Sequence, residues 1–363
     1  MSLVDKKIKV MVVDDSAVIR QVMADIIVNE SDIQLESAAD PIFALRRMEK
    51  NWPDVIVLDV EMPRMDGITF LRKIMAERPT PVVMCSSLTS SGAKVTLEAL
   101  AAGAIDIITK PKSGTKAALM EENKLIIDTI KSAAKVKSLK KLSIRQNDSA
   151  NVAQNVSKKY SADAVISKGV NRVSHVTDKF VAIGTSTGGT QALEAVLREL
   201  PPSSPGIVVV QHMPGQFTKA FAERLNRICA VTVLEGVNGH EIKTGNVIIA
   251  PGDKHMTVKR HNNQYFVEIV DGPLVNRHKP SVDVLFRSVA KFAGKNALGV
   301  IMTGMGDDGA RGLKELRETG AHTIGQDEAT CIVYGMPNEA FKLGAVEKEL
   351  PLQLIANEIS NFR

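Results

Sequence analysis

The sequence lacks any long hydrophobic run. None of its apolar stretches approaches the roughly 18 residues that a membrane-spanning helix needs, and its opening residues, MSLVDKKIKV, lack the charged-then-apolar pattern of a signal peptide. Cysteine is scarce: Cys85, Cys229 and Cys331 are an odd number at no metal-ligand spacing. We therefore expect a cytoplasmic protein with reduced thiols and no direct insertion into a membrane.

The positive charge of the chain is concentrated in one segment. The net charge is +5, but residues 131–160 hold eight Lys or Arg side chains against a single acid, Asp148. The remainder is close to neutral and shows no helix-turn-helix pattern, so we expect no nucleic-acid partner. Apolar residues make up 44% and charged residues 24% of the 363, as in globular proteins of two or three domains.

The first part of the chain alternates between strand and helix patterns. Apolar runs predict buried parallel strands at 8–13, 55–58, 81–85 and 105–108. Helical patterns fall near 16–29, 41–50, 67–77, 91–102 and 114–137. This five-fold βα alternation predicts an open parallel sheet with helices on both faces.

The alternation of strand and helix patterns stops near residue 139 and resumes near residue 178. Between about 139 and 177 Ser, Asn, Lys, Gln and Ala dominate, which predicts a flexible basic linker between domains at 1–138 and 178–363. Strand-like runs then fall at 180–184, 206–211, 246–250 and 298–302, and a hairpin-like stretch at 255–271. Helical patterns fit 189–200, 216–228, 282–294 and 309–319. We expect a second α/β domain, so that two doubly wound parallel-sheet domains flank the linker.

Polar residues follow the predicted strands of the first domain at their carboxyl ends, where open α/β sheets form sites: Asp14, Asp15, Asp59, Ser86 and Lys110. Three carboxylates at one edge would repel one another unless a divalent cation lay among them, and their oxygens suit Mg²⁺. A hydroxyl and an ammonium group nearby could hold phosphoryl oxygens.

The motifs VVDDS, VLDVEMPRMDG, SS and TKP, in this order, resemble the receiver domains of bacterial response regulators. The resemblance implies a flavodoxin-like fold, phosphorylation of Asp59 by a chemotaxis histidine kinase, and switch roles for Ser86 and Lys110. It also implies Mg²⁺ bound by Asp14, Asp15, Asp59 and the backbone carbonyl of Glu61. The chain departs from the pattern at Ile107, where many receivers carry an aromatic switch residue, so an aromatic-flip switch is not expected.

In the second domain, the sequence GTSTG at 184–188 lies between a predicted strand and a predicted helix. This is the context that a serine nucleophile elbow needs. A dinucleotide-binding fingerprint is a competing interpretation, but it requires glycine at the position of Ser186. A phosphate-binding turn in which the serine caps the helix is a further alternative. Among seven histidines, His212 is the best placed as a base, because it ends the strand GIVVVQ. A carboxylate in the turn TGMGDDG at 303–309 could orient its imidazole.

The motifs GTSTGG, QHMP, NRHKPSVDVLF and TGMGDDGA resemble the catalytic domain of the chemotaxis receptor-glutamate methylesterase family, in which a receiver comes first. The resemblance implies Ser186 as nucleophile, His212 as base and Asp308, rather than Asp307, as the acid. We expect backbone amides of Thr187 and Met305 to form the oxyanion hole.

The implied reaction removes methyl esters from glutamates of methyl-accepting chemotaxis receptors and deamidates receptor glutamines. Hydrolysis itself then needs no cofactor. The alternative is a response regulator whose second domain only binds a partner or a nucleotide, and a DNA-binding regulator ranks below both. Loss of hydrolysis in a folded Ser186→Ala variant would exclude the binding-only alternative.

Overall fold

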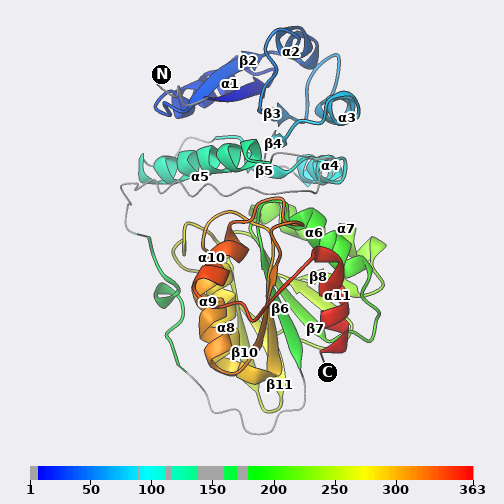
Figure 1. Cartoon of the computed structure of the whole chain (residues 1–363), viewed down its shortest axis with the longest axis vertical. Helices are drawn as coiled ribbons and strands as arrows, with labels where there is room; N and C mark the ends of the chain where they lie inside the picture. Colours follow the sequence, from blue (N-terminus) through cyan, green and yellow to red (C-terminus); the bar gives the residue numbers. More distant parts are fainter. Residues whose placement is uncertain (1–6, 88–89, 112–115, 137–158, 170–178, 363) are drawn as a thin grey trace. The chain divides into compact units, whose positions relative to one another are not determined.

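The structure is a computed structural model of the chain, and it describes residues 7–87, 90–111, 116–136, 159–169 and 179–362 (Figure 1). The chain divides into two compact units, Met1–Lys140 and Lys141–Arg363, and each is described by itself. The domain boundaries expected at 138 and 178 stay predictions. In the described ranges, no helix combines the length and apolar character that a bilayer crossing requires.

Unit 1 is a five-stranded parallel sheet with the strand order β2-β1-β3-β4-β5. Its strands are β1 Ile8–Val13, β2 Ile33–Ala38, β3 Val55–Asp59, β4 Val82–Ser86 and β5 Asp106–Thr109. Its helices are α1 Ala17–Ile27, α2 Pro41–Met48, α3 Gly67–Glu77, α4 Ser90–Ala101 and α5 Lys116–Ala134. The strand β2 lies on one side of β1 and β3 on the other, so the connections after β1 and β2 run in opposite directions across the sheet. This places the carboxyl ends of β1 and β3 at a topological switch point.

The predicted parallel sheet of unit 1 is confirmed, and its apolar strands lie within two residues of their expected positions. The strand β2 had no expected range of its own, because its sequence IQLESA mixes polar and apolar residues. The position of β2 explains this composition: β2 forms one edge of the sheet and most of its side chains are partly or fully exposed.

Unit 2 contains a seven-stranded parallel sheet with the order β14-β13-β12-β6-β7-β9-β8 and a separate antiparallel hairpin. The sheet strands are β6 Phe180–Thr185, β7 Gly206–Gln211, β8 Thr232–Glu235, β9 Asn246–Ile249, β12 Ala297–Ile301, β13 His322–Gln326 and β14 Lys348–Leu350. The hairpin consists of β10 His255–His261 and β11 Gln264–Val270. The order reverses between β6 and β12, so a second switch point lies there.

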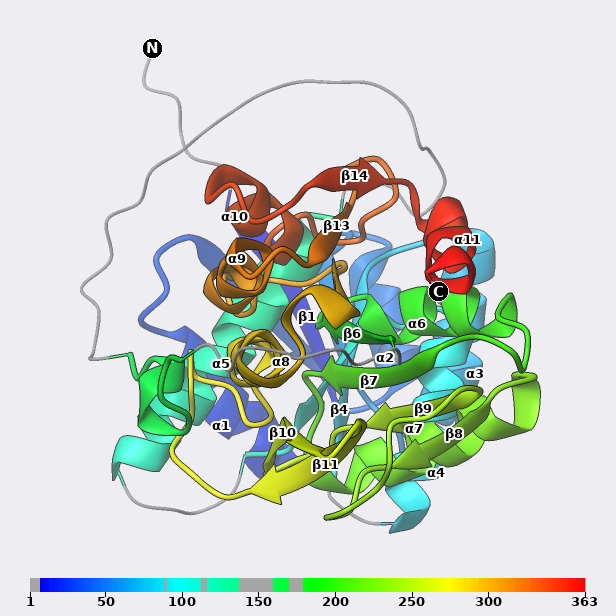
Figure 2. The same cartoon turned by 90° about the horizontal axis from the view of Figure 1, so that it is seen from below.

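Helices cover both faces of this sheet. One face carries α8 Val282–Phe292, α9 Ala310–Glu318 and α10 Met336–Lys342, and the other carries α6 Gly189–Arg198, α7 Gly215–Ile228 and α11 Leu352–Asn361 (Figures 1 and 2). A short 3₁₀ turn, η2 Gly294–Asn296, leads from α8 into β12. The strands β6, β7 and β12 are buried along their whole length, as their near-continuous apolar sequences predicted. The two parallel sheets confirm the expected fold class.

Residues 159–169 lie within the expected linker and contact unit 2. Their 3₁₀ turn, η1 Ala162–Ala164, packs its buried Ala162 against Val275 and Val284. The guanidinium group of Arg287 lies 2.8 Å from the carboxylate of Asp163. This part of the expected linker therefore contributes to the packing around the start of α8.

Candidate functional site

The predicted nucleophile Ser186 directly follows β6 and precedes α6. Its backbone N–H donates to the carbonyl of Thr303 at 3.0 Å, and its side chain is largely buried. Gly188 has a φ of +76°, and a Cβ there would lie 2.6 Å from the Cβ of Ile332. Only glycine fits this turn without strain, as expected for the elbow.

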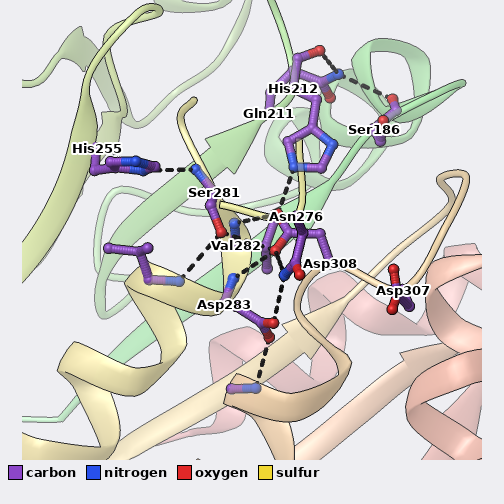
Figure 3. Close-up of polar contacts among 12 residues, drawn as sticks. Ser186, Gln211, His212, His255, Asn276, Ser281, Val282, Asp283, Asp307 and Asp308 are labelled. Carbon is purple, nitrogen blue, oxygen red and sulfur yellow. Dashed lines mark hydrogen bonds and ion pairs between the residues drawn. The ribbon is translucent and has the colours of Figure 1, made fainter. Parts of the chain in front are cut away.

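The predicted base His212 follows β7, the neighbour of β6 in the sheet. Its backbone N–H donates to the carbonyl of Thr185 at 3.1 Å. The amide of Gln211 donates to the carbonyls of Ser186 and His212, at 2.9 and 3.0 Å, and so ties the two turns together. The imidazole is buried, with 6% of the side chain exposed, and its Nε2 lies 2.8 Å from Oδ2 of Asp308 (Figure 3).

Asp308 lies in the turn between β12 and α9, and the first turn of α8 surrounds its carboxylate (Figure 3). Besides His212, it accepts hydrogen bonds from the side chains of Asn276 and Ser281 and from the backbone N–H groups of Val282 and Asp283. The amino end of a helix stabilises negative charge. Burial alone would raise the pKa of Asp308, but the hydrogen bond from His212 and the charges of His212 and His278 hold it well below its ordinary value.

The neighbouring Asp307 has a different environment. Its side chain is 42% exposed and forms an ion pair with Lys159 of the 159–169 segment. Figure 3 shows its carboxylate apart from the imidazole of His212. The structure thus brings Ser186, His212 and Asp308 together at the carboxyl ends of the central strands β6, β7 and β12 and leaves Asp307 outside this group.

The residues expected to form the oxyanion hole flank Ser186 from two segments. Thr187 follows Ser186 directly, and Met305 follows Gly304, where a Cβ would lie 2.7 Å from the Cβ of Ser186. The N–H groups of Ser186 and Gly304 are used within the fold, since they donate to the carbonyls of Thr303 and Val333. The role of the backbone amides of Thr187 and Met305 in the oxyanion hole stays a prediction.

Several residues around this group were not identified from the sequence: Gln211, Asn276, His278, Ser281 and Asp283. All but Gln211 belong to the motif NRHKPSVDVLF, which signals a functional segment without saying which of its residues contact the acid. Asp283 is buried beside Asp308. Burial and then the charge of Asp308 raise its pKa to about 7, although it accepts hydrogen bonds from Gly312 and Asn276.

In unit 1, the predicted phosphorylation residues meet at the ends of β1, β3 and β5. The ammonium group of Lys110 lies 2.8 Å from Oδ2 of Asp59 and 3.0 Å from Oδ2 of Asp14. Carboxylate oxygens of Asp14, Asp15 and Asp59 lie within 4.8 Å of one another. Burial, and then the charge of Asp14, raises the pKa of Asp59, while Lys110 opposes the shift.

This group of carboxylates fits a divalent cation. The Oδ2 of Asp14 is buried and accepts no hydrogen bond from any described residue, although Lys110 is near enough for an ion pair. A buried carboxylate oxygen of this kind is suited to bind a metal ion. Glu61 lies two residues beyond Asp59 and is exposed, so its expected role as a carbonyl ligand stays a prediction.

The expected switch hydroxyl, Ser86, ends β4 and is buried. Its Oγ lies 3.0 Å from the hydroxyl of Thr96 on α4, a contact that the sequence did not suggest. Ile107 on β5 is also buried, with 8% of its surface exposed, so an aliphatic core side chain occupies the aromatic switch position. An aromatic ring at position 107 is therefore excluded as the switch of this unit.

Comparison with known proteins assigns a family to each of the two parts of the chain. The family model of the CheB methylesterase matches residues 181–359, and that of the response regulator receiver domain matches residues 10–121. A protein-glutamate methylesterase/protein-glutamine glutaminase 2 of Hahella chejuensis is 59% identical over 96% of this chain and 94% of its own length. A protein of the same name from Dechloromonas aromatica is 58% identical over 98% of both chains.

A solved structure resembles unit 2 in the same way. The catalytic domain of the Thermotoga maritima CheB methylesterase is 38% identical, and it covers 52% of this chain and 100% of its own with a TM-score of 0.51. These matches confirm both resemblances stated from the sequence. The chain therefore belongs to the family of the protein-glutamate methylesterase/protein-glutamine glutaminases, with a response regulator receiver domain ahead of a CheB methylesterase domain.

Proposed function

We propose that this protein is a phosphorylation-regulated serine hydrolase that removes methyl esters from receptor glutamates and deamidates receptor glutamines. The observation that carries the proposal is the His212–Asp308 pair, with its 2.8 Å contact, on the sheet edge that also bears Ser186. The substrates are methyl-accepting chemotaxis receptors, and adaptation of chemotaxis is the physiological role. The names of the two bacterial relatives support both activities.

The two nitrogens of His212 have different tasks in this proposal. The lowered pKa of Asp308 keeps its carboxylate ionised, so it accepts the proton on Nε2. The Nδ1 atom is buried and has no hydrogen-bond partner among the described residues. Its lone pair therefore serves as the base for the hydroxyl of Ser186. In chymotrypsin-like proteases the acid binds Nδ1 instead, so the nitrogens exchange roles here.

The reaction proceeds through an acyl-enzyme. The Oγ of Ser186 forms a bond to the ester carbon, while His212 takes the hydroxyl proton. The bond from that carbon to the methoxy oxygen then breaks, and His212 returns the proton to this oxygen, so that methanol leaves. Water then attacks the acyl-enzyme, loses a proton to His212 and releases Ser186 and a glutamate carboxyl group. A glutamine side chain gives the same acyl-enzyme with ammonia as the leaving group. Backbone amides of Thr187 and Met305 stabilise the oxyanion.

Phosphorylation belongs to unit 1 in this proposal. Asp59 accepts the phosphoryl group from a chemotaxis histidine kinase, and Lys110, already paired with Asp59, stabilises the added charge. Mg²⁺ would be held by Asp14, Asp15, Asp59 and the carbonyl of Glu61, and when bound it neutralises phosphoryl oxygens. Since the proposed partners of both units meet inside the cell, the protein acts in the cytoplasm.

Methanol release from methylated receptor, with and without a small-molecule phosphodonor, tests the proposal. The wild-type chain should release methanol, and the phosphodonor should raise the rate. The Ser186→Ala variant should accept phosphate on Asp59 but release no methanol above background. Methanol release by a folded Ser186→Ala variant would disprove the assigned nucleophile.

A further inference from the structure

A two-residue turn beside the candidate triad has an unusual backbone. Val275 and His278 exchange backbone hydrogen bonds of 3.1 and 2.8 Å across it. The two residues between them, Asn276 and Arg277, have φ values of 50° and 70°. Residues other than glycine adopt this left-handed conformation less readily, because their Cβ comes close to the following carbonyl oxygen. The fold therefore holds this turn in place through other contacts.

Asn276, the second residue of the Val275–His278 turn, fixes the acid. The side-chain amide of Asn276 donates to Oδ1 of Asp308 and to Oδ2 of Asp283, both at 2.7 Å (Figure 3). Its two protons are thus shared between two buried carboxylates. The backbone N–H of Asn276 donates to the carbonyl of Tyr160 at 3.0 Å, which anchors the turn from the 159–169 segment.

The last residue of the turn contacts the base. The imidazole of His278 is stacked on that of His212, with ring centroids 3.7 Å apart and an angle of 8° between the ring planes. The hydrogen bond to Asp308 holds one edge of the His212 ring but leaves the ring free to tilt about that bond. A parallel ring against the face of His212 removes this tilt. Together, the two contacts fix the direction of Nδ1.

We propose that His278 is a positioning residue for His212, and that the Val275–His278 turn orients the base and the acid together. The inference rests on the proposed role of His212 as the base. The stacked ring acts by its shape, and its own nitrogens take no part in proton transfer. His278 contacts neither the nucleophile nor the leaving group in this role.

The surroundings of His278 keep its imidazole ring uncharged, which agrees with a positioning role. Burial, followed by the neighbouring His212, lowers the pKa of His278 to about 3, with Lys159 and Arg277 adding to the shift and Asp308 opposing it. The ring is therefore neutral at pH 7. A neutral ring does not repel His212 when the latter takes a proton from Ser186, whereas a cationic ring would.

The test compares three substitutions of His278 in the full-length chain. His278→Ala and His278→Gln remove the ring, and His278→Phe keeps an aromatic face without nitrogens. His261→Ala is the matched control, because His261 is an exposed histidine at the end of β10. The measurements are kcat and KM for methyl ester hydrolysis, thermal unfolding, and the low-field proton resonance of the Nε2–H of His212. Asp308→Asn identifies that resonance by abolishing it.

We expect both ringless variants to lose kcat by roughly 10- to 100-fold with KM changed less than about twofold, as for a misplaced catalytic group. Their low-field resonance should broaden or shift. His278→Phe should recover most of kcat and of the resonance, and His261→Ala should match the wild type. A folded ringless variant with wild-type kcat would overturn the proposal, and so would a folded His278→Phe variant as inactive as His278→Gln. Wild-type methanol release by Ser186→Ala would instead overturn the proposed function.

Discussion

Asp307 and Asp308 are adjacent in the chain, yet their carboxylates have different partners. Asp308 is buried and binds Nε2 of His212 at 2.8 Å, whereas Asp307 is 42% exposed and pairs with Lys159. The turn between β12 and α9 points consecutive side chains in different directions. Of these two adjacent carboxylates, only that of Asp308 belongs to the candidate site.

The two aspartates should therefore respond differently to the same substitution. Asp308→Asn presents an amide where the carboxylate accepted five hydrogen bonds, and it favours the wrong tautomer of His212. We expect kcat for methyl ester hydrolysis to fall by roughly 10³- to 10⁴-fold, still above the Ser186→Ala background. Asp307→Asn should retain kcat within about twofold. A larger loss in Asp307→Asn than in Asp308→Asn would show that the acid is misassigned.

The contact between Gly304 and Ser186 gives a second prediction. A Cβ at Gly304 would lie 2.7 Å from the Cβ of Ser186 and 2.4 Å from the sulfur of Met336, so Gly304→Ala must displace the nucleophile. We expect kcat to fall at least about tenfold. Gly169→Ala is the control, because a Cβ there meets only the side chain of Lys291, at 3.7 Å. Equal kcat values for the two alanine variants would contradict the close packing around Ser186.

Phosphorylation should depend on Asp59 and on a divalent cation. Asp59→Asn removes the carboxylate that pairs with Lys110, and a chelator removes the ion that the three carboxylates would hold. Either change should abolish phosphate incorporation from a small-molecule phosphodonor. Asp25→Asn, on the exposed face of α1, should leave incorporation unchanged. Acid-stable phosphate on a serine or threonine would argue against an acyl phosphate at Asp59.

The buried Asp283 should make the stability of unit 2 depend on pH. Its pKa in the folded chain is about 7, against an ordinary value of 3.8. The folded state therefore binds more protons than the unfolded state between about pH 4 and pH 7, and the free energy of unfolding falls as pH rises through this range. Asp283→Asn lacks this ionisation, so its pH profile should be flatter than that of the wild type.

The aromatic residues allow the two units to be followed separately. Trp52, the single tryptophan, lies in unit 1, and the three tyrosines, Tyr160, Tyr265 and Tyr334, lie in unit 2. Near-ultraviolet tyrosine signals should show the flatter profile of Asp283→Asn, while the fluorescence of Trp52 should be unchanged. A tyrosine profile with the wild-type slope would contradict the raised pKa of Asp283.

The sequence predicted the residues that end apolar strands, because a buried parallel strand is visible as a continuous apolar run. Ser186 and His212 follow such strands, and so do Asp14 and Lys110. Short strands were harder to find: β13 with the sequence HTIGQ and β14 with KEL have no apolar run of useful length. The helices α10 and α11 were also not predicted.

The residues that hold the triad in place could not be predicted by the same reasoning. Asn276, His278 and Ser281 lie in a loop between the hairpin and α8, where no periodicity assigns a direction to a side chain. Their positions depend on the path of the chain after β11 and on the αL conformation of the turn. The preference for Asp308 over Asp307 came from family resemblance, because strand ends alone do not distinguish adjacent residues in a turn.

The insertion of β12 between β6 and β13 has a consequence for synthesis of the protein. His212 and Asp308 are 96 residues apart in the sequence, and β12 must pair with β6 before the acid can reach the imidazole. A growing chain on the ribosome therefore exposes Ser186 and His212 long before their carboxylate has been translated. Incomplete products that contain the receiver, the serine and the histidine should therefore hydrolyse esters far more slowly than the complete chain.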